Sequence, residues 1–97
     1  MLCGGVNPEM PADKNIQEIC DKMKSYVENH AGKKYSVFKA KTYRTQPVAG
    51  TNYFVKVHVG GEEYVHLQIF EPLTCNGGEI TLSKVELTKT QLFNLYG

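Results

Sequence analysis

The stretch TNYFVKVHVGGEEYVHLQI, residues 51–69, alternates apolar and polar side chains on either side of a glycine pair. Alternation with a period of two is typical of half-buried β-strands, and the glycines indicate a hairpin turn between two of them. The apolar members of both strands have odd numbers, so facing residues must have numbers that sum to an even value. A two-residue Gly60-Gly61 loop would violate this parity, whereas a loop of three or five residues with a glycine bulge satisfies it. His58 and His66 are then predicted on the other face of the sheet, which we expect to be the more solvated one.

Before this hairpin, between residues 14 and 31, apolar side chains recur at spacings of three and four residues, which is the period of an amphipathic helix. The stripe comprises Ile16, Ile19, Cys20, Met23, Val27 and His30. Asp13 is suited to cap the N-terminus, and Gly32 is suited to close the last turn in the left-handed conformation. The pattern therefore predicts one helix over residues 14–31.

Two further strands are predicted around these elements. Residues 35–45 are rich in aromatic and β-branched side chains and predict a strand. A break follows at residues 46–50, because Pro47 cannot donate a hydrogen bond to a ladder. The last strand is predicted over residues 80–87, with a bulge near Ser83-Lys84, where the alternation changes phase.

These elements predict a single domain over residues 1–97. Residues 1–12 contain two glycines and two prolines and show no periodicity, which predicts an extended, loosely held arm. One helix followed by antiparallel strands predicts an α+β fold in which one face of the sheet packs against the helix.

The composition limits the classes of partner. The 97 residues carry a net charge of +1, so nucleic acid is not an expected partner. No apolar run reaches the length of about 18 residues that crosses a bilayer, so no membrane is expected either. The sequence has no secretory signal, and its three cysteines (Cys3, Cys20 and Cys75) cannot all pair within one chain. We therefore predict a cytoplasmic protein with free thiols and leave access to the nucleus open.

Catalytic and metal sites have little support in the sequence. Cys75 in a predicted loop could pair with His58 or His66, but no Ser, Asn or Asp signature surrounds this cysteine. The two histidines lack the further ligands of a closed metal site. Cys20 belongs to the helix stripe and is interpreted as a core residue. We expect no catalytic residues, metal or cofactor, and a small thiol enzyme is kept only as an alternative.

Apolar residues at predicted turns are harder to explain as architecture. Val48 and Ala49 occupy one turn and Leu73 another, where Asn, Asp or Ser are usual. Leu2 and Val6 belong to the predicted arm. If the arm and both turns lie at one end of the sheet, they form a docking surface; otherwise they are unrelated turns.

The run Gln46-Pro47-Val48-Ala49-Gly50 matches the Gln-x-Val-x-Gly motif of the cystatins, which inhibit papain-like cysteine proteases. The longer run TQPVAGTNYFVKVHV, residues 45–59, resembles the stefins, the single-domain intracellular cystatins, as do the opening residues 1–5 and Val65-His66-Leu67. The resemblance implies a helix gripped by a curled antiparallel sheet of five strands. It also implies reversible, competitive occlusion of a protease active site of the cathepsin type, without a cofactor.

The same resemblance implies which residues bind the protease. The arm around Gly4 and Gly5 would enter the non-primed side of the cleft. The first hairpin, Gln46 to Gly50, would cover the catalytic centre, and the second hairpin, with Leu73 and Thr74, would rest on the primed side. The implied binding residues are Gly4, Gly5, Gln46, Pro47, Val48, Ala49, Gly50, Leu73 and Thr74.

Three questions stay open at this point. Stefins often carry Leu-Pro at the second hairpin, where this chain has Leu73-Thr74 with a proline one residue earlier. We expect a monomer, although the strands flanking residues 46–50 could open into one long strand and form a domain-swapped dimer. A non-inhibitory binding module on the same fold is the alternative function.

Overall fold

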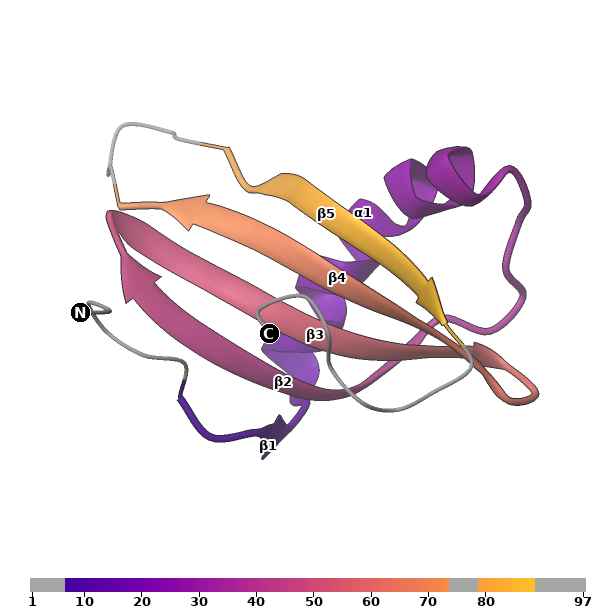
Figure 1. Ribbon diagram of the computed structural model, residues 1–97, viewed down its shortest axis with the longest axis horizontal. Helices are drawn as coiled ribbons and strands as arrows, with labels where there is room; N and C mark the ends of the chain where they lie inside the picture. Colours follow the sequence, from indigo (N-terminus) through magenta and orange to yellow (C-terminus); the bar gives the residue numbers. More distant parts are fainter. Residues whose placement is uncertain (1–6, 74–78, 89–97) are drawn as a thin grey trace.

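The computed structural model describes residues 7–73 and 79–88, which form one helix and five strands. In chain order these are β1 (Met10–Pro11), α1 (Lys14–Ala31), β2 (Lys39–Val48), β3 (Gly50–Gly60), β4 (Glu63–Pro72) and β5 (Thr81–Thr88). The strands form one antiparallel sheet in the order β1-β2-β3-β4-β5, and α1 crosses one face of it (Figure 1). The predicted α+β class and the five-stranded antiparallel sheet are confirmed.

Both ends of α1 are capped as the sequence predicts. The Asp13 side chain accepts a hydrogen bond from the backbone N–H of Ile16 at 2.9 Å, which satisfies one of the free donors of the first turn. At the other end, Gly32 has a φ of 76°, and its N–H donates to the Glu28 carbonyl at 2.8 Å. The helix therefore begins and ends at the predicted residues.

The core lies between α1 and the sheet. Buried side chains of the helix pack against the odd-numbered residues of β3 and β4; the two sets are Ile16, Ile19, Cys20, Met23 and Val27, and Val55, Val57, Val59, Val65, Leu67 and Ile69. Burial of each large aliphatic side chain contributes roughly 1.5–3 kcal/mol. His30 was assigned to the stripe and is exposed instead. It lies in the last turn, where an imidazole suits the carbonyl end of the helix dipole.

The strand predicted over residues 35–45 is displaced toward the C-terminus, because β2 begins at Lys39. Tyr35 and Phe38 are buried without belonging to a strand. The Tyr35 N–H donates to the Glu28 carboxylate at 2.9 Å, and the Gln17 side chain donates to the Phe38 carbonyl at 3.0 Å. Side chains of α1 thus satisfy this backbone in place of a neighbouring strand, so the aromatic residues reach the core from a connecting segment.

The N-terminal segment from Asn7 to Ala12 is not loosely held, contrary to the prediction. Met10 pairs with Tyr43 of β2, so this segment extends the sheet at its edge. The N–H of Asn7 donates to the Thr45 carbonyl at 2.8 Å, and that of Ala12 donates to the carbonyl of Lys41 at 2.9 Å. A strand of two residues that includes a proline has no period to detect. Residues 1–6 of the predicted arm lie outside the described residues.

The pairing of β3 with β4 follows the predicted parity. Val57 faces Val65, so the residue numbers of facing pairs sum to an even value. Beyond the pair His58–Tyr64 a bulge shifts the register, so that Gly60 faces Glu63 with an odd sum and the chain turns at Gly61 and Glu62. The predicted bulge in the last strand is also present, since Gln68 faces Lys84 and Ile69 faces Leu82, which leaves Ser83 without a partner in the ladder.

The sheet face opposite α1 is less solvated than predicted. His66 has an exposed fraction of 0% and its cross-strand neighbour Lys56 one of 8%, whereas His58 is only half-buried. The Nδ1 atom of His66 lies 3.5 Å from a carboxylate oxygen of Glu86. Charged neighbours on adjacent strands make such burial tolerable. Alternation assigned both histidines to the right face and wrongly implied that His66 is solvated.

Candidate functional site

The hairpin between β2 and β3 is tight and regular up to its tip. Gln46 faces Asn52, and Val48 faces Gly50, which leaves only Ala49 as the turning residue. The Asn52 side-chain amide donates to the Gln46 side-chain oxygen at 3.2 Å across the two strands. The strand pairing and this hydrogen bond therefore join the two sides of the hairpin up to its tip.

Gly50 is required at its position for two independent reasons. Its φ is 130°, a region that residues with a side chain rarely adopt. A Cβ atom there would lie 2.4 Å from the carbonyl oxygen of Glu71 and 2.9 Å from the ring of Phe70 on β4. The close approach of β3 to β4 at this point fixes where the hairpin tip stands relative to the end of β4.

The two apolar turns predicted from the sequence lie at the same end of the sheet (Figure 1). Gly50 pairs with Pro72, which directly precedes Leu73. Leu73 has an exposed fraction of 79% and Val48 one of 45%. Two large apolar side chains are therefore presented to solvent close together, as a docking surface requires. Of the other predicted site residues, Gly4, Gly5 and Thr74 lie outside the described residues.

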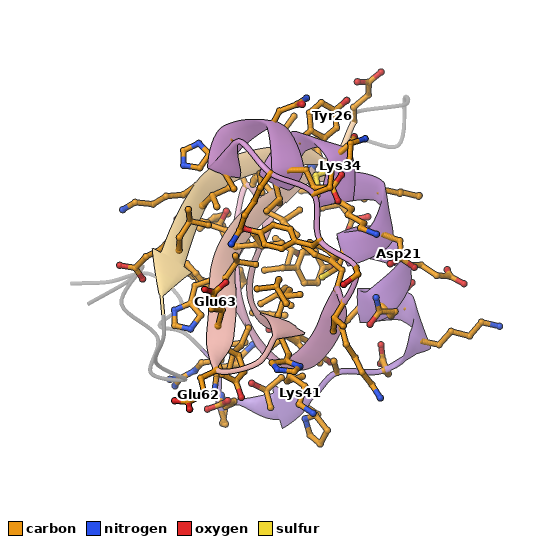
Figure 2. The ribbon with its side chains drawn as sticks, turned by 90° about the vertical axis from the view of Figure 1, so that its right-hand side faces the viewer. Asp21, Tyr26, Lys34, Lys41, Glu62 and Glu63 are labelled. Carbon is orange, nitrogen blue, oxygen red and sulfur yellow. The ribbon has the colours of Figure 1, made fainter. Side chains whose placement is uncertain are left out.

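The opposite end of the sheet carries a pocket and charged side chains. A pocket of about 500 Å³ there is lined by residues that include Lys33, Tyr35 and Glu63. Lys33 and Glu63 form an ion pair of 3.2 Å. Figure 2 looks onto this end and shows charged side chains, among them Glu62 of the β3–β4 turn and Glu63, the first residue of β4. Charge gathers at this end, whereas residues 46–50 carry none.

The ionisable groups nearest the first hairpin are partnered. The Tyr53 hydroxyl donates to the Glu71 carboxylate at 2.8 Å. Burial, together with this hydrogen bond, raises the pKa of Tyr53 to about 12. The tyrosine is therefore neutral over the whole physiological range, and residues 46–50 themselves carry no charge.

Those of the residues considered for catalysis that the structure describes do not form a catalytic group. Burial raises the pKa of the Cys20 thiol to about 12, so the nucleophilic thiolate is absent at neutral pH. Cys75 lies outside the described residues. His58 faces Tyr64 and His66 faces Lys56, so the two histidines are not direct cross-strand partners. Among residues 7–73 and 79–88, no group of three His, Cys, Asp or Glu side chains could hold a metal ion.

The structure adds residues that the sequence analysis did not single out. Asn7 lies beside Thr45, the residue directly before the hairpin tip, and the Arg44 guanidinium donates to the Asn7 carbonyl at 2.8 Å. The start of the described chain is thus brought to the same end of the sheet as the two apolar turns. No periodicity signals this contact, because the partners are 37 residues apart in the sequence.

The helix of the described part of the chain is too polar to span a membrane.

Comparisons with known proteins point to one family. The cystatin domain matches residues 4–96. Cystatin-B of Oplegnathus fasciatus is 51% identical over 90 residues, which cover 93% of this chain and 90% of that protein. Cystatin-B of Paralichthys olivaceus is 58% identical over 85 residues, covering 88% and 87% of the two chains. Human cystatin-B is 43% identical over 91 residues, covering 94% and 93%.

Proposed function

Because this chain belongs to the cystatin family, we propose that it inhibits papain-like cysteine proteases by inserting three segments into the active-site cleft. As a cystatin it is a cysteine protease inhibitor and not an enzyme. The three segments, called the wedge below, are the arm with Gly4 and Gly5, the hairpin Gln46 to Gly50, and the turn with Leu73 and Thr74. Within the wedge, the first hairpin covers the catalytic centre.

The observation that carries this proposal is the exposure of Val48 and Leu73 at one end of the sheet. Apolar side chains can be buried in a cleft without polar compensation. A hairpin fixed by its own ladder loses little conformational entropy when it docks, so more of the contact energy appears as affinity.

The wedge accounts for inhibition without cleavage. The glycines of the arm allow its backbone to run close to the protease wall, and Leu2 or Cys3 offers a substrate-like side chain. The chain then turns away from the catalytic centre, so that no peptide carbonyl is presented to the protease thiolate. Inhibition is therefore reversible and needs no cofactor.

The direct test is the activity of papain on a peptide substrate with increasing amounts of the protein. We expect loss of activity that rising substrate concentration reverses, because inhibitor and substrate compete for one cleft. Full papain activity at micromolar protein would contradict the proposal and favour a non-inhibitory binding module on the same fold. A cathepsin is expected to behave like papain, and the cytoplasmic location stays a prediction.

The protein is proposed to act as a monomer, and a domain-swapped dimer is expected not to inhibit. In such a dimer β2 and β3 would continue as one strand through Val48 and Gly50, which abolishes the tip. Heating below the unfolding temperature and separating the species by size supplies both forms from one sample. The monomer from that sample is the control, and a dimer that inhibits papain as well as the monomer would contradict the expectation.

A further inference from the structure

The first described residue, Asn7, makes more contacts than an edge position needs. Its N–H donates to the Thr45 carbonyl at 2.8 Å, and its side-chain amide donates to the Thr45 hydroxyl at 2.8 Å. Its carbonyl accepts from the Arg44 Nε atom, again at 2.8 Å. The backbone N–H, the backbone carbonyl and the side chain of one exposed residue are thus all bound to two consecutive residues of β2.

Two residues later, Glu9 ties the same segment to a second strand. One oxygen of its carboxylate accepts hydrogen bonds from the Thr42 hydroxyl on β2 and from the Lys56 ammonium on β3, the latter at 2.9 Å. The side chain of Lys56 is only 10% exposed, so this ion pair is less screened by water than a surface pair. The hydrogen bonds from Thr42 and Lys56 lower the pKa of Glu9, which keeps the carboxylate charged in mildly acidic solution.

These contacts lie directly beside the wedge. Thr45 precedes Gln46, the first residue of the hairpin in the wedge. Asn7 directly follows residues 1–6 in the sequence, and Gly4 of the arm stands three residues before it. The contacts of Asn7 and Glu9 thus decide where the arm starts relative to the hairpin.

We infer that Asn7, Arg44, Thr45, Glu9 and Lys56 form a clamp that aligns the arm with the first hairpin, so that both enter a protease cleft as one preorganised surface. This inference rests on the proposed inhibition by the wedge. The clamp residues are positioning residues, because they act through the arm. Releasing the clamp would let residues 7–9 move, and their ordering would then have to occur on binding.

A purely structural role is the competing explanation. The segment would then merely cover the edge of β2 and protect it from pairing with other chains. The two explanations differ in one respect. A clamp matters for inhibition only when the arm is present, whereas an edge cover affects the domain with or without the arm.

The test is a double-mutant cycle with the variant Asn7→Ala/Glu9→Gln. Dissociation from papain is measured for this variant and the wild-type protein, each with and without residues 1–5. In the full chain we expect the variant to dissociate about 10- to 100-fold faster. In the truncated chain the same substitutions should change the rate by less than about twofold, because the aligned segment is gone.

Two measurements separate the outcomes. The control Glu63→Gln removes the Lys33–Glu63 ion pair, whose length of 3.2 Å is similar but which lies at the opposite end of the sheet, and it should leave dissociation unchanged. Hydrogen exchange at the backbone N–H of residue 7, which donates to the Thr45 carbonyl in the wild-type protein, should accelerate in the Asn7→Ala/Glu9→Gln variant if the contact has opened.

Equal effects of the clamp substitutions in the full and truncated chains would overturn the inference. So would faster exchange at the backbone N–H of residue 7 with unchanged dissociation, because an opened clamp would then have no consequence for binding. A wild-type chain that leaves papain fully active would instead refute the proposed function itself, and the wild-type measurement comes first for that reason.

Discussion

Val48→Asp is expected to weaken the inhibition of papain by at least about a hundredfold. Val48 lies at the hairpin tip with 45% of its surface exposed, so a carboxylate at this position stays hydrated in the free protein. In the complex the same carboxylate would be buried without a partner, which costs about 3–5 kcal/mol. The inhibition constant against papain, measured with a peptide substrate, checks this result.

Val37→Asp is the matched control for this substitution. Val37 is 39% exposed and lies two residues before the start of β2, at the other end of the sheet. The Val37→Asp variant should keep both the inhibition constant against papain and the unfolding temperature close to those of the wild-type protein. A Val48→Asp variant that unfolds at a clearly lower temperature would show that Val48 belongs to the core. Unimpaired inhibition by Val48→Asp would show that the tip does not enter the cleft.

Local chemistry explains which parts of the fold were predictable. The bounds of α1 follow from a cap at Asp13 and a left-handed Gly32, both of which act within a few residues of the helix end. The register of β3 against β4 follows from parity, because a slip by one residue would move the apolar side chains out of the core. The bulge at Ser83 was visible as a change of phase.

The missed features depend on contacts that are distant in the sequence. Tyr35 and Phe38 have strand-like composition but lie in a connecting segment, whose backbone is satisfied by α1. Burial of His66 could not be read from alternation, which assigns a face without saying what lies near it. In each case a tertiary contact overrides a local preference.

In the candidate site too, features with a local signal were predictable and contacts between distant residues were not. The hairpin tip was visible as a run of apolar residues between two strands and as a motif, and the structure brings it next to Leu73. The contacts of the N-terminal segment were not visible, because Glu9 and Lys56 are 47 residues apart and neither belongs to a pattern. Short hydrogen-bonded segments of this kind emerge only when the sheet has been assembled.

Gly50→Ala is expected to destabilise the domain by about 3–4 kcal/mol and to impair inhibition with it. Part of the cost, about 1–2 kcal/mol, is the strain of a side chain at a φ of 130°. The rest arises because the new Cβ would lie 2.4 Å from the Glu71 carbonyl, so β3 and β4 must separate where Gly50 pairs with Pro72. Urea unfolding gives the stability change, and the papain assay gives the loss of inhibition.

Gly60→Ala measures the strain of a side chain at a positive φ separately from the clash with a neighbouring strand. Gly60 has a similar φ of 117°, but a Cβ there would have nothing within 4 Å, and it lies at the other end of β3. We therefore expect Gly60→Ala to lose only about 1–2 kcal/mol of stability and to inhibit papain like the wild-type protein. If both variants lose the same stability, the close approach of the Glu71 carbonyl has no energetic weight. If Gly50→Ala is destabilised yet inhibits normally, the hairpin tip does not depend on its alignment with β4, and the wedge must be held together by the N-terminal segment alone.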